Sequence, residues 1–362
     1  MMRVILTGGG TAGHVTPNMA LIPRLLLEDW EIHYIGTEDG IERRLIETID
    51  GVSYHSVKSG KLRRYYDPKN FSDPFRVVAG AVQSAKLIHK IKPDIVFSKG
   101  GFVSVPVVYG ARAHGVPVLL HESDMTPGLA NRLSAPLSEV LCCTFPEAAA
   151  LAGKKGRVTG TPLREDLFTG DRKKGLKLFG FDDSSPVLMV MGGSSGAQAI
   201  NDVVRRSLSR LTDGFQVLHL CGKGNLDDEC EGISRYRQIE YLNEDMKQAY
   251  AIASVIISRA GSNSLSEILA LNKPALLIPY PKGSTSRGDQ IDNARSFEER
   301  QLARVLMQED MTADTLSERI VEVYRDRGTL IDAMEREPSA DGTMNVMRLI
   351  HQYAKPYKTK KE

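Results

Sequence analysis

One arrangement occurs twice in this sequence: a short apolar run ends in glycines, and a helical pattern follows. The first copy is Arg3–Thr7 with the glycines of 8–10, and the second is Val187–Met191 with the glycines of 192–193. Glycine allows the positive φ that a tight turn from a strand into a helix requires. Each copy predicts a strand, a turn and a helix, and 362 residues leave room for two α/β domains of roughly 150 residues each.

Around these turns, short apolar runs alternate with amphipathic stretches, which is typical of parallel sheets covered by helices. In the first half we expect helices at 19–27 and 77–91, and strands at Arg3–Thr7, Glu31–Gly36, Ile95–Ser98, 116–121 and 139–144. In the second half we expect strands at Val187–Met191, 215–221, 255–258 and 274–279.

A change of domain is expected at Gly160-Thr161-Pro162, before a charged stretch that leads to the second glycine-ended strand. The first domain then comprises 1–161 and the second 162–340. A last helix, at about 341–356, is expected to pack back on the first domain. Two Rossmann-like domains of this kind bind ligands in a cleft at the carboxyl ends of their strands.

The overall composition argues against several classes of protein. A net charge of +2 gives no general attraction to nucleic acid. The four cysteines lack metal-ligand spacing and no Asp-x-Asp pair ends a strand, so we expect neither a metal nor a cofactor. The apolar start is shorter than a signal-peptide core of about 7–15 residues, and no run approaches the roughly 20 apolar residues of a membrane span. A cytoplasmic protein with peripheral membrane contact is expected.

The first glycine turn also matches a nucleotide-binding pattern. Gly8, Gly10 and Gly13 form G-x-G-x-x-G directly after a strand, so a dinucleotide fold and a purely structural turn are both open. His14 argues against a dehydrogenase, because it stands at the helix start, where a pyrophosphate needs bare N–H groups. The helix dipole would keep its imidazole neutral, as a general base requires. Packing beside the turn explains His14 equally well.

The second glycine turn, 192–197, offers backbone N–H groups and the Ser194 hydroxyl to a diphosphate. Arg164, just past the domain junction, could approach the same phosphates. A structural turn and a solvated surface arginine remain the alternatives.

The segment 258–267 runs from a strand end through small polar residues into a helix. We expect Ser262 or Asn263 to cap this helix, with Glu267 in its first turns. Glu267 then belongs either to the capping arrangement or to a site that accepts two ribose hydroxyls. Downstream, 289–293 supplies carboxylate and amide side chains that suit sugar hydroxyls or solvent.

A stretch at 58–93 combines cations with apolar side chains. Such a surface would be attracted to an anionic membrane leaflet, by about 1 kcal/mol per Lys or Arg. Alternatively, the helix at 77–91 buries its apolar face within the domain. The cations are Lys58, Lys61, Arg63, Arg64, Arg76, Lys86, Lys90 and Lys92.

Five ordered motifs, taken together, resemble the MurG family of UDP-N-acetylglucosamine:lipid I N-acetylglucosaminyltransferases. They are 7–14 with Thr16-Pro17, 100–104, 121–131, 192–197 with Asn201, and 259–267 with Asp289, Gln290 and Asn293. The resemblance runs nearly end to end. It implies a GT-B fold, with UDP-GlcNAc held mainly by the second domain and the lipid acceptor by the first.

The resemblance also implies roles for single residues. His14 matches the candidate base and Glu122 an acceptor-side residue that could assist it. Glu267 matches the glutamate that binds the ribose, and Gln290 the glutamine that reads the sugar. The remaining donor-side positions are Thr11, Gly13, Arg164, Gly193, Ser194, Leu242, Met246, Arg259, Gly261, Ser262, Asp289 and Asn293. The remaining acceptor-side positions are Gly10, Gly101, Phe102, Asp124 and Asn131.

This chain departs from the family pattern at Phe102, Asp124 and Asp289, where tyrosine, asparagine and glutamine are common. The reaction implied is attack of the C4 hydroxyl of lipid I on GlcNAc with inversion, giving lipid II at the cytoplasmic face of the membrane. Two rivals share the donor residues: a synthase that glycosylates diacylglycerol, and a non-catalytic protein that binds UDP-sugars. A hydride-transfer enzyme is a third alternative.

Overall fold

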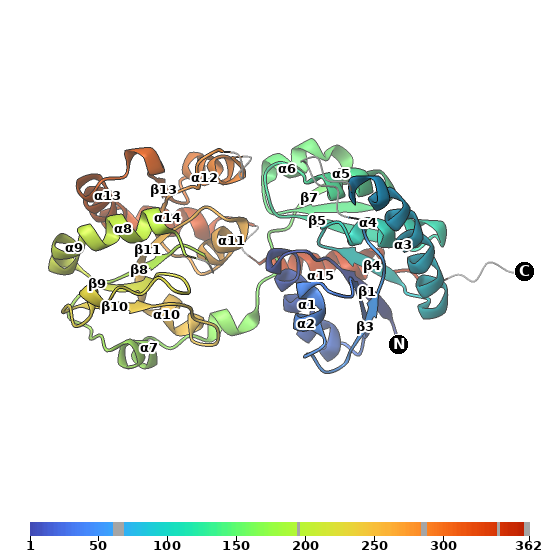
Figure 1. The fold of residues 1–362 in the computed structure, drawn as a ribbon, viewed down its shortest axis with the longest axis horizontal. Coiled ribbons are helices and arrows are strands. Elements are labelled where there is room, and N and C mark those ends of the chain that lie inside the picture. Colours follow the sequence, from blue (N-terminus) through green and yellow to red (C-terminus); the bar gives the residue numbers. More distant parts are fainter. Residues whose placement is uncertain (61–68, 194–195, 284–287, 339–340, 358–362) are drawn as a thin grey trace, which may run out of the picture. The chain divides into compact units, whose positions relative to one another are not determined.

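The computed structural model describes residues 1–60, 69–193, 196–283, 288–338 and 341–357, with the backbone alone for 69–76. The chain divides into two compact units (Figure 1). The first comprises Met1–Arg164 with Asp341–Glu362, and the second comprises Glu165–Ala340. The sequence placed this change of domain three residues earlier, at 161/162.

The first unit is built on a seven-stranded sheet in the order β3-β2-β1-β4-β5-β6-β7, with every pair parallel. Its strands are β1 (Arg3–Thr7), β2 (Glu31–Gly36), β3 (Val52–Ser56), β4 (Ile95–Ser98), β5 (Val118–Glu122), β6 (Val140–Cys143) and β7 (Gly156–Val158). Its helices are η1 (Ala12–His14), α1 (Thr16–Leu27), α2 (Ile41–Ile46), α3 (Lys69–Ile91), α4 (Ser104–Ala113), α5 (Leu129–Ser134), η2 (Ala135–Leu137), α6 (Pro146–Leu151), η3 (Gly153–Lys155) and α15 (Gly342–Tyr353).

The second unit repeats the plan with a six-stranded parallel sheet in the order β10-β9-β8-β11-β12-β13. Its strands are β8 (Val187–Met191), β9 (Gln216–Leu220), β10 (Tyr236–Ile239), β11 (Ala253–Ser258), β12 (Ala275–Leu277) and β13 (Arg304–Val305). Its helices are η4 (Glu165–Thr169), α7 (Arg172–Phe179), α8 (Gln198–Arg206), α9 (Leu208–Gly214), η5 (Asp228–Cys230), α10 (Met246–Ile252), α11 (Ser262–Ala270), α12 (Asp289–Glu299), η6 (Gln308–Asp310), α13 (Ala313–Arg325) and α14 (Arg327–Glu335).

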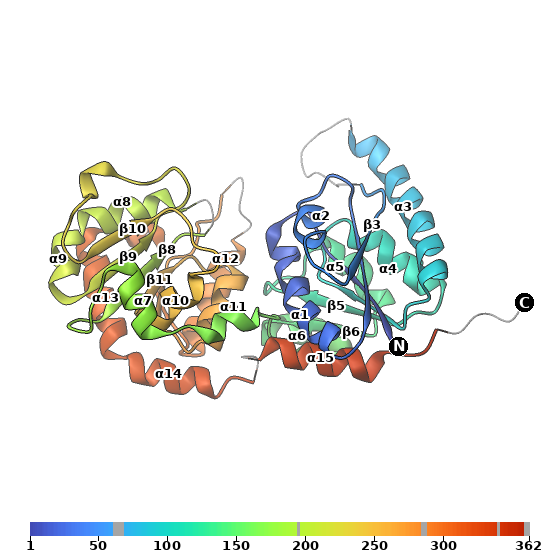
Figure 2. The same ribbon diagram turned by 90° about the horizontal axis from the view of Figure 1, so that it is seen from below.

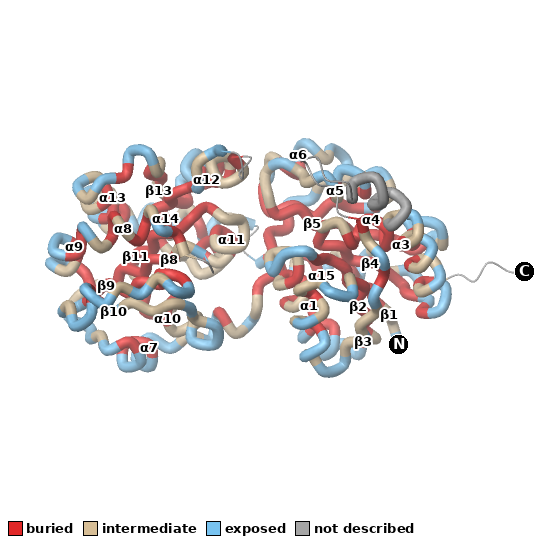
Figure 3. Tube along the Cα trace, viewed as in Figure 1, coloured by how far each residue is buried: buried red, intermediate tan, exposed pale blue. Residues whose placement is uncertain are grey.

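The central strands of both sheets are buried on both faces (Figure 3), which explains why their sequences are continuous apolar runs. The sequence analysis missed β3, β7, β10 and β13. These four are the edge strands of the two sheets. Each is partly exposed, so none carries the uninterrupted apolar run that marked the inner strands.

The C-terminal helix α15 belongs to the first unit and packs against α1 and β4 (Figure 2). Val346, Met347 and Ile350 join the core cluster that also contains Trp30. At the start of the helix, the Thr343 hydroxyl accepts from the Leu163 amide at 3.0 Å and donates to its carbonyl at 3.1 Å. Burial of three large apolar side chains, at about 1.5–3 kcal/mol each, explains why the chain returns to this unit. Within the described residues, no helix is both long and apolar enough to cross a bilayer.

Each sheet has one point at which the strand order reverses. It lies between β1 and β4 in the first unit and between β8 and β11 in the second. Loops that leave adjacent strands in opposite directions at such a point form the ligand crevice of open α/β sheets. All the glycine turns singled out in the sequence follow one of these four strands.

Candidate functional site

In the first unit, the loops after β1 and β4 pack backbone against backbone. Gly101 has a φ of +83°, and a Cβ at this position would lie 2.3 Å from the Gly9 carbonyl oxygen. The buried carboxylate of Glu42 holds the first loop, because it accepts from the Gly10 amide at 3.1 Å and the Thr37 amide at 3.0 Å. Both turns therefore require glycine for steric reasons, with or without a ligand.

His14 ends the short helix η1, two residues before α1 begins. Its Nδ1 lies 3.0 Å from the Thr11 hydroxyl oxygen. Burial and the nearby Lys99 ammonium lower the pKa of His14 to about 4, against the opposing effect of Asp124. A neutral ring at neutral pH is what the sequence predicted, but the causes are burial and a lysine charge rather than the helix dipole.

Lys99 lies directly after β4 with only 2% of its surface exposed. Its backbone amide donates to the Thr7 carbonyl at the end of β1, and its ammonium donates to the Ser123 hydroxyl. Burial lowers the pKa of Lys99, and the carboxylates of Glu122 and Asp124 oppose that shift. A cation therefore lies beneath the loops of β1, β4 and β5.

Glu122 ends β5 and is 6% exposed. One carboxylate oxygen accepts from the amides of Ser123 at 2.9 Å and Asp124 at 3.2 Å. The other accepts from the Gly128 amide at 2.8 Å and from the Asn131 side-chain nitrogen at 3.0 Å. Four donors from one turn surround this carboxylate, so the geometry favours a role in holding the turn over a role as proton acceptor.

A cavity of about 700 Å³ opens beside the loops of this unit. Gly10 and Phe102, both assigned to the acceptor side, line it together with Glu42. Its size falls within the range of about 300–1,000 Å³ typical of small-molecule sites. Outside the lining of this cavity, the contacts described above gather six predicted residues at the ends of β1, β4 and β5: Thr11, His14, Gly101, Glu122, Asp124 and Asn131.

In the second unit, the loop after β8 begins α8. Gly193 is exposed at a φ of +88°, and Gly196 has a φ of +75°. A Cβ at Gly196 would lie 2.1 Å from the Cys221 carbonyl oxygen, so this glycine rests directly on the turn after β9. Ser194, predicted to contact a diphosphate, lies outside the described residues.

The loop after β11 leads into α11 differently from the prediction. Gly261 is the N-cap, with extended backbone and no capping side chain, and the helix begins at Ser262. The expectation that Ser262 or Asn263 caps the helix is therefore wrong. A Cβ at Gly261 would meet no atom of the described residues within 4 Å. Asn293 of α12 donates to the Ala260 carbonyl at 3.2 Å and braces this loop.

Glu267 lies on α11, and its carboxylate accepts from the Tyr250 hydroxyl of α10 at 2.6 Å. Glu267 is the sixth residue of α11, beyond the first turn of the helix. Gln290, at the second position of α12, accepts from the Tyr280 amide at 2.9 Å through its side-chain oxygen. That bond leaves the nitrogen end of the Gln290 amide as the group that could read a sugar hydroxyl.

Arg259 is used within the domain. Its guanidinium donates to the carbonyls of Ile278 at 3.1 Å and Pro279 at 3.2 Å, and to the Gln308 side chain at 2.7 Å. It also lies over the Tyr280 ring, 5.4 Å from the centroid. These contacts tie the end of β11 to the end of β12, so Arg259 supports the loop that carries Gly261.

The other donor-side candidates are placed more simply. Leu242 follows β10, Met246 opens α10 and Asp289 opens α12, all partly exposed. Gly13 lies in η1, and Arg164 is the last residue of the first unit before the second begins. Among the described residues, no three His, Cys, Asp or Glu side chains are arranged to hold a metal ion.

The sequence analysis did not single out Lys99, Glu42, Tyr250 or His219. Lys99 carried a local signal, because a charged residue lay between a buried strand and a glycine pair. The others had none. Glu42 lies 32 residues from the Gly10 amide that it accepts from, and Tyr250 lies 17 residues from Glu267.

Two family models match the chain. The Glycosyltransferase family 28 N-terminal domain matches residues 4–139, and the Glycosyltransferase family 28 C-terminal domain matches 187–350. A protein of Clostridium botulinum (strain Langeland) is 48% identical over 98% of this chain and all of its own length. A protein of Lachnospira eligens is 50% identical over the same shares. Both are named UDP-N-acetylglucosamine–N-acetylmuramyl-(pentapeptide) pyrophosphoryl-undecaprenol N-acetylglucosamine transferase.

Solved structures share the fold. Acinetobacter baumannii MurG superposes with a TM-score of 0.77 at 22% identity, covering 97% of this chain and 100% of its own. The calicheamicin glycosyltransferase CalG4 superposes with a TM-score of 0.69 at 13% identity, covering 97% of this chain and 98% of its own. The two parallel sheets and these matches establish a two-domain GT-B fold. The chain belongs to glycosyltransferase family 28 and, within it, to the MurG family that its five motifs resemble.

Proposed function

We propose that this protein transfers N-acetylglucosamine from UDP-GlcNAc to the C4 hydroxyl of the N-acetylmuramyl sugar of lipid I, with inversion, to form lipid II. The observation that carries this proposal is 48–50% identity to transferases of that name over 98% of the chain and the whole of each relative. Identity over both domains covers the donor and the acceptor half alike.

On the acceptor side, the geometry supports a base at His14. The ring is neutral above a pKa of about 4, so it can accept the proton that the attacking hydroxyl loses. In the reaction, the hydroxyl oxygen bonds to the anomeric carbon, the bond from that carbon to the UDP oxygen breaks, and the proton passes to the imidazole. General-base catalysis of this kind contributes about 10²–10⁴-fold.

Glu122 has a positioning role in this proposal, because it holds the turn that carries Asp124 and Asn131. The buried side-chain oxygen of Asn131 has no hydrogen-bond donor among the described residues. Its two amide hydrogens are used by the His121 carbonyl and the Glu122 carboxylate. That oxygen is therefore fixed in direction and ready to accept from an acceptor hydroxyl.

On the donor side, Glu267 is the acceptor for the ribose hydroxyls and Gln290 the reader of the sugar. The loop after β8 receives the diphosphate of the leaving UDP through backbone N–H groups at the start of α8. Stabilisation of the leaving charge by such preorganised donors is usually the largest catalytic term. No cofactor takes part in this scheme, since UDP-GlcNAc is a substrate.

A lipid acceptor requires contact with the membrane, and α3 supplies a suitable face. Val78 is 64% exposed and Val82 is 52% exposed, one helical turn apart, and Lys86 and Lys90 continue that exposed face. The opposite face of α3 is buried, so the helix packs on the domain core and still presents apolar side chains to solvent. Of the rest of the surface predicted at 58–93, 61–68 lies outside the described residues and the side chains of 69–76 are not described.

The decisive experiment is transfer of radiolabel from UDP-[14C]GlcNAc to a short-chain lipid I analogue in the presence of EDTA. A labelled product with a β1→4 linkage is expected, and an analogue without the C4 hydroxyl is the matched control. Intact UDP-GlcNAc binding without transfer would refute the assignment of lipid I. Transfer to diacylglycerol instead would identify the glycolipid synthase.

Membrane contact is tested by sedimentation with vesicles that contain anionic phospholipid. The protein should sediment with them at low salt, and Val78→Glu with Val82→Glu should weaken this at unchanged turnover of a water-soluble acceptor. Equal sedimentation of the double variant would contradict the role of α3.

A further inference from the structure

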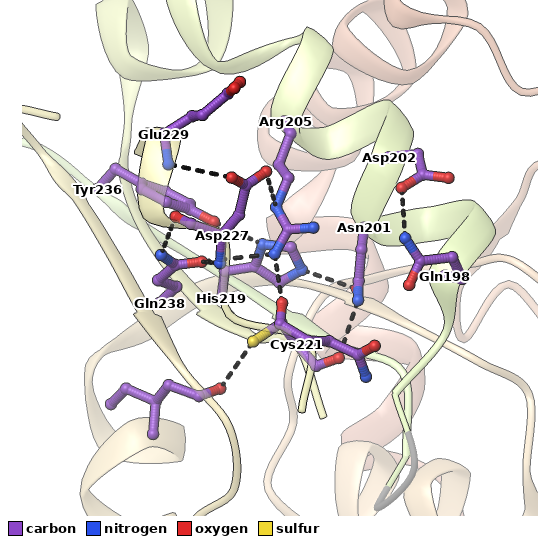
Figure 4. Close-up of polar contacts among 12 residues, drawn as sticks. Gln198, Asn201, Asp202, Arg205, His219, Cys221, Asp227, Glu229, Tyr236 and Gln238 are labelled. Carbon is purple, nitrogen blue, oxygen red and sulfur yellow. Dashed lines mark hydrogen bonds and ion pairs between the residues drawn. The ribbon is translucent and has the colours of Figure 1, made fainter. Parts of the chain in front are cut away.

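A chain of hydrogen bonds in the second unit joins α8 to β9 and β10 (Figure 4). It begins at the Tyr236 hydroxyl, 2.9 Å from Nδ1 of His219. The Nε2 of His219 lies 3.0 Å from the Asn201 side-chain oxygen, and the Asn201 nitrogen lies 2.8 Å from the Cys221 carbonyl oxygen. None of Asn201, His219 and Tyr236 is more than 8% exposed.

The carbonyl end fixes the direction of every bond in this chain. A carbonyl only accepts, so the Asn201 nitrogen donates to Cys221 and the Asn201 oxygen must accept. His219 therefore donates through Nε2–H, and its Nδ1 accepts from the Tyr236 hydroxyl. Burial and, to a smaller extent, the Arg205 charge lower the pKa of His219 to about 3, so the ring holds a single proton at neutral pH.

The chain of hydrogen bonds ends at the Cys221 carbonyl oxygen, and Gly196 packs on that same atom. Gly196 is seated so closely on the Cys221 carbonyl that a Cβ would lie 2.1 Å from its oxygen. Asn201 is on α8, the helix that this loop begins. The Asn201 amide thus joins α8 to the turn after β9, and Gly196 packs on the same Cys221 carbonyl.

Arg205 supports the same turn from the next turn of α8. Its guanidinium donates to the Asn225 carbonyl, and its Nε lies 3.4 Å from an Asp227 carboxylate oxygen. Gln238 holds Asp227 in turn, donating to its carbonyl at 2.6 Å and accepting from its amide at 3.1 Å. The turn at 222–227 is therefore held at its far end by Arg205 and Gln238. At its near end, Asn201 bonds to the Cys221 carbonyl, and His219 orients Asn201.

We propose that His219 is a positioning residue of the donor site. It orients the Asn201 amide and thereby holds Gly196 and the start of α8, whose backbone N–H groups receive the diphosphate of UDP. The proposal rests on the function proposed above for the site itself. His219 touches no substrate in it and acts through Asn201 and the Cys221 carbonyl. If the ring turned or changed tautomer, the Asn201 amide would have to turn as well, and its oxygen would then face the carbonyl oxygen.

The test uses two amides of different reach in the full-length enzyme. The nitrogen of glutamine occupies nearly the position of Nε2, and that of asparagine nearly the position of Nδ1. His219→Gln should keep the bond to Asn201 and leave the KM for UDP-GlcNAc within about 2-fold, whereas His219→Asn should raise it. Loss of one buried hydrogen bond corresponds to a rise of about 5–10-fold in KM and in the Kd for UDP. The KM for the lipid I analogue should not change in either variant.

Two controls separate positioning from stability. Met334→Ala empties a buried site on α14, outside the hydrogen-bonded chain, and should lower the melting temperature without changing the KM for UDP-GlcNAc. Nitrogen-15 spectra should show the Nε2–H tautomer of His219 from pH 5 to 8. Tyr236→Phe removes the donor to Nδ1 and should allow the Nδ1–H tautomer to appear as well.

Equal donor KM values in His219→Gln and His219→Asn, or an Nδ1–H tautomer, would overturn the inference. If no lipid acceptor is glycosylated, the Kd for UDP still decides it. If lipid I is glycosylated and the two variants bind UDP alike, the function stands and the inference fails.

Discussion

Replacing Glu122 with glutamine exchanges one carboxylate oxygen for an NH₂ group. Each oxygen of Glu122 accepts two hydrogen bonds, from Ser123 and Asp124 on one side and from Gly128 and Asn131 on the other. Whichever oxygen is replaced, two N–H donors lose their acceptor at a side chain that is 6% exposed. At about 1–3 kcal/mol for each unsatisfied buried donor, the first domain should lose about 2–6 kcal/mol of stability.

The protein contains one tryptophan, Trp30, and it lies in the core of the first domain. Its fluorescence during urea unfolding therefore reports this domain alone. We expect Glu122→Gln to unfold at clearly lower urea and to raise the KM for the lipid acceptor, with the pH profile of kcat unchanged. Glu139→Gln makes the same chemical change at an exposed carboxylate and should leave all three quantities unchanged. A variant with native stability but no turnover would show that Glu122 takes the proton itself.

Substitutions at three further residues each test one contact or charge of the site. His14→Ala should lower kcat by about 10²–10⁴-fold while UDP-GlcNAc binding, measured by calorimetry, stays intact. Wild-type turnover should fall as the pH falls through about 4, where the ring takes up a proton. Full turnover by His14→Ala would show that His14 is not the base. Lys99→Met removes the charge that lowers the pKa of His14, so the acidic limb of the pH–rate profile should move to higher pH, whereas Lys99→Arg should keep it in place. Tyr250→Phe removes the donor to Glu267 and should raise the KM for UDP-GlcNAc about 5-fold, the effect of roughly 1 kcal/mol, at constant acceptor KM.

The sequence predicted the inner strands of both sheets, which are buried on both faces. Runs such as Val187–Met191 contain nothing but buried apolar residues, and a run this short and this apolar is typical of an inner strand of a parallel sheet. Edge strands such as β13 (Arg304–Val305) carry no such pattern, because hydrogen bonds to one neighbouring strand hold them in place. The glycine turns were predictable for a related reason, since only glycine fits the close contact between Gly101 and Gly9.

The site was predicted less completely, because several of its side chains act across long separations in the sequence. Resemblance to a family gave roles to His14 and Glu267. It did not reveal that Lys99 lowers the pKa of His14 or that the Tyr250 hydroxyl donates to Glu267. Local reasoning also misplaced the start of α11. The extended backbone of Gly261 leaves the N-cap without a side chain, where a serine had seemed the better choice.

The two domains hold their glycine loops with different kinds of side chain, charged in the first and neutral in the second. In the first, buried carboxylates accept from the turns: Glu42 from the loop after β1 and Glu122 from the turn after β5. The Lys99 ammonium interacts with the carboxylates of Glu122 and Asp124 and lowers the pKa of His14. In the second, the contact beneath Gly196 is held by the neutral side chains of Asn201 and His219. A carboxylate there would repel the charge that grows on UDP as it leaves. Near His14, the carboxylates of Asp124 and Glu42 raise the pKa of the ring, but burial and the Lys99 charge outweigh them. The neutral brace beneath Gly196 therefore suits the negative charge that the second domain must stabilise on the leaving UDP.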